Sequence, residues 1–537
     1  MSGLVINRIG YPSRKFLIAV FSVAYVVVFF LHRKFFLLAE DVTQMSLVLA
    51  VSVAGSLAFI WVDYDRFGDI FRRLSRLSAI GVLVYLLYEP VDLTLVVGGD
   101  EGLYRLIAYS YWPAVAFAAV GALRPSMAYA PAMYLLLSRE AAPLISGYNI
   151  STLDIRFMMD MAMFLGVSAS ILGLLKLSRS QVRLDDHETK VLEQCLAFSA
   201  IGMHLANYLW SGYAKFMLGP TPVTWIVENP TATAIPMGIY KGVSPFGQWP
   251  MFAQYLYDTF TFSAPISNFF VASIQLAAGI VVFRMLLLRI ATLFYDALHI
   301  GIYIFGGLFF WPWVWNNVSV LYAVKGKTDA DVSIYPRICC VAVMVLGMSS
   351  KLGDAAFLAW FDTPRVRASI IEIHDKSTDE WIRLPTSYFL SHSYAMSHGY
   401  FGHAMREGHF SPSVGGTKSY DQFLLRDECI APKSYDRIEQ PEEFDQRLQR
   451  FDRFVQAHHR KMLARADENG QVSIYLRGHH HPSNPLLYTE FSALDLRDVD
   501  AYRYLDISAC LTMSDGKVHE QLVKKDEHVI EIDRPEQ

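Results

Sequence analysis

The sequence predicts a polytopic α-helical membrane protein, with about 8–10 membrane helices, followed by a soluble α+β domain. Of its 537 residues, 53% are hydrophobic, which is above the usual globular range. Apolar runs long enough to cross a bilayer recur as far as residue 352. Composition then changes, because residues 363–537 hold 28 of the 51 acidic residues and 12 of the 16 histidines. We therefore expect a membrane domain over 1–362 and a soluble domain over 363–537.

The candidate membrane helices are apolar runs, since a transmembrane helix needs about 20 mostly apolar residues. The first run follows Arg14 and Lys15 and has no small-residue cleavage site after it, so we expect a retained helix rather than a removed signal peptide. The fifth run is short, and the ninth is long enough to be a broken or tilted helix, which explains the range in the predicted number. The runs are 16–32, 46–62, 77–98, 104–123, 127–138, 157–177, 191–217, 265–288, 291–323 and 336–352.

Basic residues in the short connections predict the orientation of the chain. Lys and Arg are enriched in cytoplasmic loops of membrane proteins. They precede the first run and lie between the second and third and between the sixth and seventh, whereas residues 98–101 have none. This pattern predicts a cytoplasmic N-terminus. The net charge of −4 gives no reason to expect a nucleic acid as partner.

Three other segments have composition or spacing patterns that predict their local structure. Residues 218–262 are rich in Pro, Gly and aromatic residues, which favours a folded loop in the membrane interface. In the soluble domain, residues 442–466 have apolar side chains at helical spacing and predict an amphipathic helix. Strand-like alternation predicts strands at 366–373, 472–476 and, in pieces, 521–532.

Neither the cysteines nor the histidines of the chain indicate a cross-linked or metal-bound fold. There are five cysteines, three of them in or beside apolar runs, and they do not suggest a disulfide framework. The histidines of the soluble domain lack the short ligand spacings of zinc sites, so no metal is expected. The seven clustered ones among these twelve histidines are His392, His398, His403, His409 and the run 479–481.

A polar stripe inside the seventh run is the first candidate site. His204, Tyr208, Ser211 and Lys215 are spaced four, three and four residues apart, so they share one helix face. Ionisable residues in membrane spans are costly and point to function. An apolar setting disfavours the charged ammonium, so such a lysine can act as a base near neutral pH. The alternative is a lysine at a helix end whose amine reaches interfacial water.

A second stripe lies in the ninth run, where Asp296, His299 and Tyr303 are spaced three and four residues apart. An apolar, aromatic stretch at 304–315 follows it. The alternative to a functional role is a structural hydrogen bond between two helices. No Walker loop, Rossmann glycine fingerprint or Gly-x-Ser-x-Gly elbow is present in the sequence.

Three segments resemble one family. Residues 211–215, Ser-Gly-Tyr-Ala-Lys, are similar to the small-residue-then-lysine segment of vitamin K-dependent γ-glutamyl carboxylases and the bacterial proteins that share their HTTM membrane domain. Residues 297–303, Ala-Leu-His-Ile-Gly-Ile-Tyr, followed by the glycine- and aromatic-rich 305–312, resemble a second family segment. Residues 472–476 and 494–499 are similar to the soluble tail of the bacterial relatives. The resemblance covers most of the chain in order.

The resemblance implies an activity. In that family a lysine deprotonates a reduced quinone, and oxygen then converts the quinone to an epoxide through a strongly basic intermediate that removes a substrate proton. Lys215 would be the base and His299 its active-site partner. Polar neighbours would help to bind a vitamin K-like hydroquinone, the implied cofactor: His204, Tyr208, Ser211, Asp296 and Tyr303. The chain would be a carboxylase-like or quinol-epoxidase-like lyase or oxidoreductase in a bacterial inner membrane, in contact with lipids and with a protein or peptide substrate.

The chain also departs from the family pattern. No asparagine–histidine segment is clear in an earlier helix, and the nearest stretch, residues 147–151, has no histidine. The tail is shorter than that of the animal carboxylases, so glutamate carboxylation is not implied as firmly as quinol chemistry. The rival hypothesis is a non-catalytic membrane subunit or scaffold, in which Lys215 and His299 would lie apart. A transporter is a weaker third reading, since no inverted repeat is evident.

Overall fold

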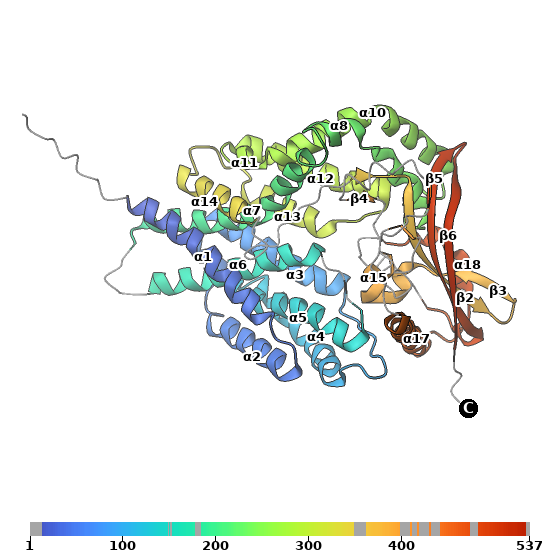
Figure 1. Ribbon diagram of the computed structural model, residues 1–537. Helices are drawn as coiled ribbons and strands as arrows, with labels where there is room; N and C mark the ends of the chain where they lie inside the picture. Colours follow the sequence, from blue (N-terminus) through green and yellow to red (C-terminus); the bar gives the residue numbers. More distant parts are fainter. Residues whose placement is uncertain are drawn as a thin grey trace, which may run out of the picture.

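The computed structural model describes residues 13–148, 150, 153–177, 184–347, 361–397, 409–410, 416–417, 429–430, 441–472 and 482–532. Its N-terminal part is a bundle of helices, and its C-terminal part is built on an antiparallel sheet (Figure 1). The bundle and the sheet lie at opposite ends of the molecule (Figure 1). The predicted order of a helical part followed by an α+β part is therefore confirmed.

Most helices of the bundle begin and end close to the predicted apolar runs, but α3 ends ten residues before the end of the run 77–98, and α10 begins 15 residues before the run 265–288. Within the described residues, three are long and apolar enough to cross a membrane: 14–36, 156–177 and 285–306. Large apolar side chains stay exposed on the bundle, as on a surface that lipid covers. The longer elements are α1 (Arg14–Phe36), α2 (Val42–Ala58), α3 (Asp69–Tyr88), α4 (Glu101–Gly121), α5 (Tyr129–Ser146), α6 (Leu153–Leu177), α7 (Asp186–Phe216), α10 (Pro250–Leu276), α12 (Met285–Gly306), α13 (Trp311–Ala323) and α14 (Ile334–Leu346).

Other boundaries also differ from the prediction. The short fifth run is part of α5, which continues to Ser146. The long ninth run is two helices, because Gly307 ends α12 in the left-handed conformation with φ of 70°. The predicted loop 218–262 contains α8 (Thr224–Glu228), α9 (Ala234–Tyr240) and the start of α10, which begins with proline at its first position. Its proline and glycine residues mark helix ends there rather than an irregular loop.

Helix α7 is the centre of the bundle. It starts with a capping box between Asp185 and Glu188, which satisfies two of its first backbone N–H groups. Two glycines let other helices approach closely. A Cβ at Gly202 would lie 2.5 Å from the carbonyl oxygen of Cys340 in α14, and one at Gly212 would lie 2.5 Å from the backbone nitrogen of Leu276 in α10. These contacts fix α10 and α14 against α7.

The C-terminal sheet has the strand order β3-β2-β5-β6, and all its neighbours are antiparallel. Its strands are β2 (Arg365–Asp375), β3 (Glu380–Arg383), β5 (Val499–Ser514) and β6 (Lys517–Glu531). Helix α17 (Pro441–Leu463) packs Phe451 and Phe454 in the same apolar cluster as Tyr502 and Tyr504 of β5. The predicted strand 366–373 and helix 442–466 are confirmed. The strand predicted in pieces at 521–532 is a single strand, β6. Residues 473–476 of the strand predicted at 472–476 lie outside the described part.

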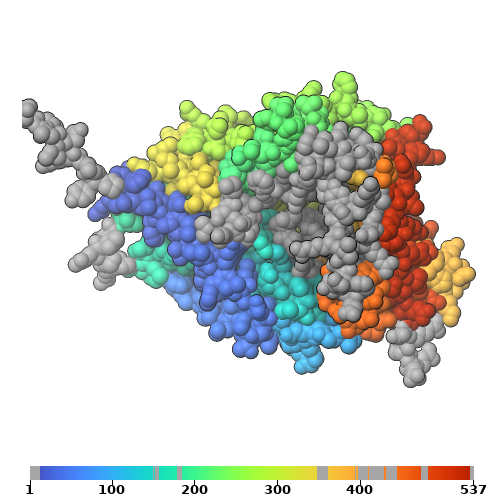
Figure 2. Space-filling view, viewed as in Figure 1, coloured from blue at the N-terminus to red at the C-terminus, as the bar shows by residue number. Residues whose placement is uncertain are grey.

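The C-terminal domain packs directly against the bundle (Figure 2). The carboxylate of Asp92, just after α3, lies 2.5 Å from Nζ of Lys461 in α17, and this amine also donates to the carbonyl oxygen of Leu93 at 2.6 Å. Thr94 Oγ1 and His458 Nδ1 are 2.8 Å apart. These polar contacts hold the two parts as one body. The connection at 348–360 lies outside the described residues.

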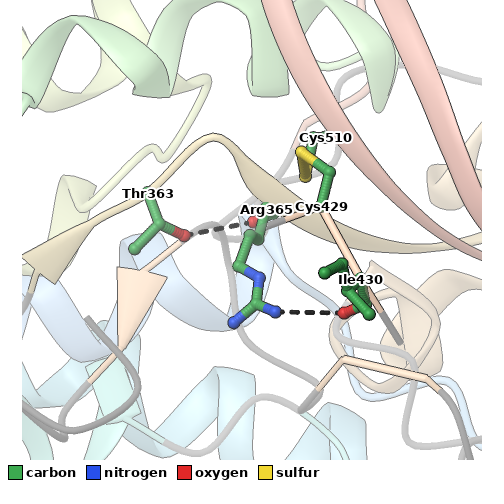
Figure 3. The surroundings of a disulfide bond; sticks show 5 residues. All are labelled: Thr363, Arg365, Cys429, Ile430 and Cys510. Carbon is green, nitrogen blue, oxygen red and sulfur yellow. Dashed lines mark hydrogen bonds between the residues drawn. A yellow bond between two sulfur atoms is a disulfide. The ribbon is translucent and has the colours of Figure 1, made fainter. Parts of the chain in front are cut away.

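A disulfide bond joins Cys429 to Cys510 of β5 (Figure 3). The cysteines did not suggest a disulfide framework, and the structure has this one bond, whereas Cys195, Cys339 and Cys340 are free and buried. The two partners are 81 residues apart in the sequence, so no local spacing could reveal the pair. Next to the bond, Arg365 donates to the carbonyl oxygen of Ile430 at 3.2 Å (Figure 3).

Candidate functional site

A cavity of about 380 Å³ lies where α7, α10 and α12 approach the C-terminal domain. Its volume is in the range of small-molecule sites. The walls are mainly apolar and aromatic, and the polar groups come from α7, from residues 229–231, from α10, from His299 of α12 and from Asp362. The aromatic wall residues are Trp225, Phe260, Phe305, Phe310 and Trp313.

Lys215 is in the last turn of α7 and is one of the residues that line this cavity. It is only 7% exposed. Its Nζ donates to the carbonyl oxygen of Ser211 at 3.3 Å and lies 5.2 Å from the ring centre of Trp225, a cation–π distance. The lysine therefore does not extend to water as a helix-end lysine would. Its amine lies inside the protein.

His299 of α12 lines the same cavity, so the prediction that Lys215 and His299 share one cavity is confirmed. His299 Nδ1 lies 2.8 Å from the carbonyl oxygen of Tyr295. A carbonyl can only accept, so Nδ1 carries the proton and Nε2 is left as an acceptor. The ring packs 5.5 Å from Phe310 and 5.2 Å from Trp313. This packing fixes the orientation of the imidazole.

Tyr208 and Ser211 of the first polar stripe also line the cavity, but His204 does not. His204 Nε2 lies 2.7 Å from Oδ1 of Asn317, a residue of α13. The same amide donates to the hydroxyl of Tyr208 at 2.9 Å and to Asp296 at 2.9 Å. Asn317 thus ties the two stripes together behind the cavity wall.

Two further predicted cofactor-binding residues lie away from the cavity wall as well. Asp296 accepts from Asn317, and Tyr303 packs against Phe309 with ring centres 4.9 Å apart. Helical spacing identified the cavity-lining face of α7 in part, but on α12 only His299 of the predicted stripe lines the cavity. Spacing also could not show that α13 inserts Asn317 between the two stripes. The prediction that His204, Asp296 and Tyr303 contact a ligand is therefore not supported by their positions.

The sequence reasoning missed a polar cluster at the domain junction. Asn229 Nδ2 donates to Oδ2 of Asp362 at 2.9 Å, and the backbone N–H of Asp362 donates to Oδ1 of Asn229 at 2.7 Å. Asn268 of α10 donates to the carbonyl oxygen of Asn229 at 2.8 Å, and Thr231 donates to Asn268 at 2.6 Å. All four residues line the cavity. They come from three separate segments and follow no helical spacing, so no signal in the sequence joined them.

The histidines of the C-terminal domain that the structure describes have structural contacts. His392 contacts the backbone N–H of Thr94 at 3.3 Å. Burial lowers the pKa of His458 to about 3, so this histidine is neutral between the two parts of the protein. Among the described residues, no group of three or more side chains could hold a metal ion. His398, His403 and residues 479–481 lie outside the described part.

In comparisons with known proteins, the chain matches no family model, no curated protein and no solved structure. What the cavity can do therefore follows from its own chemistry. It combines one buried amine, one imidazole with a fixed acceptor nitrogen and aromatic walls. This set suits removal of a proton from a weakly acidic hydroxyl on a flat, apolar molecule.

Proposed function

We propose that this chain is a multi-pass membrane enzyme in which Lys215 takes a proton from a reduced quinone bound in the cavity. One observation carries the proposal, namely that Lys215 and His299 line the same largely apolar cavity. In a non-catalytic scaffold, Lys215 and His299 would not need to line the same cavity. The shared cavity therefore favours an enzyme.

The residues present fit a quinone-sized ring. Phe305, Phe310 and Trp313 offer flat apolar surfaces, and Lys215 and His299 supply one proton acceptor each. A reduced quinone would supply electrons for a reaction with oxygen when bound. Lys215 would accept the phenolic proton, and His299 Nε2 would accept a hydrogen bond from a hydroxyl. The apolar walls would keep bulk water from the reacting groups.

A lipid-soluble molecule would reach this cavity from the side. The cavity is lined by one face of α10 and one face of α12. The opposite faces of these helices are exposed and apolar, with Phe262 89%, Ile266 62% and Ile300 50% exposed. Such faces suit contact with lipid. We infer that entry occurs between α10 and α12.

We further propose that the N-terminus is cytoplasmic and that the C-terminal domain lies on the opposite side of the membrane. Basic residues gather at the bundle end that is far from the sheet. There Lys327 pairs with Asp69 at 2.8 Å, and Arg73 donates to the carbonyl oxygen of Lys325 at 2.9 Å. Positive charge favours the cytoplasmic side.

The disulfide supports the same orientation. Disulfides persist in oxidising compartments, and Cys429–Cys510 belongs to the C-terminal domain. In a bacterial inner membrane this side is the periplasm. A protein or peptide substrate would then be presented to the cavity from outside the cytoplasm.

The test compares two buried lysines in the full-length protein in lipid nanodiscs. Oxygen consumption driven by a reduced naphthoquinone is measured for the wild type, Lys215→Met and Lys241→Met. Lys241 is the matched control, because it is also buried, at 8% exposed, and does not line the cavity. We expect Lys215→Met to lose at least about 100-fold in rate, as for a lost general base, and Lys241→Met to keep the wild-type rate. Equal rates for all three would refute the role of Lys215.

A further inference from the structure

We propose that Asp362, in the short strand that pairs with residues 416–417 of the C-terminal domain, is the group that returns Lys215 to its neutral form by taking its proton and passing it to water. This inference rests on the proposed function, since it assigns the step that follows proton abstraction. It also assigns a role to the C-terminal domain, which would complete a site located in the helical bundle. Asp362 would be a proton-transfer residue that acts through Lys215.

The placement of Asp362 supports this role. Asp362 and Lys215 line the same cavity. The residue belongs to the short strand β1 (Phe361–Asp362) and comes directly after a phenylalanine with no exposed surface. Phe361 packs with Trp225, the ring next to the Lys215 amine. The apolar anchor therefore places the carboxylate beside the lysine.

Asn229 fixes the orientation of the carboxylate. It donates to the side chain of Asp362 and accepts from its backbone N–H, at 2.9 and 2.7 Å. Asn229 is itself 2% exposed and is held by Asn268, also 2% exposed. Two buried amides with no charge of their own thus orient one carboxylate.

The surface exposure of the two groups differs in the direction that the transfer requires. Lys215 is buried, whereas Asp362 is partly exposed. A proton held by the lysine has no direct route to water, but one held by Asp362 has. Beyond Asp362 the chain continues through Thr363 into β2, next to the disulfide at Cys510 (Figure 3). The carboxylate is thus at the boundary between the cavity and the C-terminal domain.

The transfer itself balances without any other reactant. One N–H bond of the Lys215 ammonium breaks, and its electron pair stays on nitrogen. One O–H bond forms on the Asp362 carboxylate, which becomes a neutral carboxylic acid. That acid then releases the proton to water on the side of the C-terminal domain. No atom is oxidised or reduced.

The first arm of the test does not depend on enzymatic activity. Full-length protein in nanodiscs is treated at pH 7 with a trace of acetic anhydride, which acylates only neutral amines, and the labelling rate of Lys215 is measured by mass spectrometry. Without the neighbouring negative charge the neutral amine is favoured, so Asp362→Asn should label Lys215 at least about threefold faster. The matched control is Asp258→Asn, because Asp258 of α10 hydrogen-bonds Gln254 and does not line the cavity. An unchanged labelling rate in Asp362→Asn would overturn the proposal.

The second arm uses quinol-driven oxygen consumption. Asp362→Gly should lose at least about tenfold in turnover, as expected for a lost proton-transfer group, and added formate should restore a substantial part of it. A purely structural role predicts no rescue by formate, and that outcome would also overturn the proposal. If the wild type shows no quinol-driven activity at all, the proposed function fails, while the labelling arm still decides whether Asp362 controls Lys215.

Discussion

Lys241 is a buried lysine that the proposed chemistry does not use, and replacing it should stabilise the protein. It follows α9, is 8% exposed, and its Nζ has no hydrogen-bond partner among the residues that the structure describes. Burial lowers its pKa from 10.5 to about 8. At pH 7 the amine is nevertheless protonated in both the folded and the unfolded chain. Folding at this pH therefore carries the full cost of burying an unpaired charge.

The size of this cost follows from the two pKa values. One pH unit corresponds to about 1.4 kcal/mol, so the difference between 10.5 and about 8 gives about 3 kcal/mol. Lys241→Met keeps a side chain of similar length and removes its positive charge. We expect the free energy of unfolding to rise by about 2–3 kcal/mol at pH 7. Because the folded pKa is the lower one, the gain should shrink as the pH rises from 8 towards 10.5.

Thermal unfolding in detergent, followed by tryptophan fluorescence at pH 7 and pH 9.5, measures this effect. The control is Lys461→Met, because Lys461 is also largely shielded, with 15% of its side chain exposed, but is paired with Asp92 at 2.5 Å. That substitution removes one of the two cations that pair with Asp92, the other being Arg465, and should destabilise the protein. A lower melting temperature for Lys241→Met at pH 7, or a gain that is the same at both pH values, would refute the reasoning.

Three other predictions concern the architecture around the site. Arg367→Ala removes the partner of Asp506 in an almost fully buried ion pair of 2.7 Å. We expect chemical denaturation to show a loss of about 3–5 kcal/mol in the stability of the C-terminal sheet. A loss below about 1 kcal/mol would contradict this expectation. Asp92→Asn weakens the contacts of the bundle with α17, so limited proteolysis should release the C-terminal domain sooner than in the wild type; an unchanged cleavage rate would show that other contacts dominate. Gly202→Val places a side chain against the backbone of α14 and should lower the melting temperature, which Gly55→Val, at a position with open space around it, should not do.

Much of the fold could be predicted from local patterns. The apolar runs locate α1 and α12, and helical spacing locates α17, because each of these helices has one continuous apolar surface. The short helices α8 and α9 could not be predicted, since their burial depends on contacts with α10 and with the sheet. Only the three-dimensional arrangement shows that residues 218–262 form a wall of the cavity.

The candidate site was predictable only in part, for a similar reason. Helical spacing brought Tyr208, Ser211 and Lys215 to one face, and the structure places all three at the cavity. The same rule placed His204 there too, although Asn317 holds that histidine behind the cavity wall. Asp362 belongs to another part of the fold, so no pattern within one helix could include it. Residues that meet from separate elements require the tertiary structure.

The central claim is that the cavity between α7, α10 and α12 binds a quinone, and photoaffinity labelling tests it most directly. Full-length protein in nanodiscs is irradiated with an azido-naphthoquinone, and the labelled peptides are identified by mass spectrometry, with and without an excess of unmodified naphthoquinone. We predict labelling of peptides that contain Lys215 or His299, which the competitor suppresses. Labelling confined to outward-facing parts of α1 or α4, or labelling that the competitor does not reduce, would contradict the account.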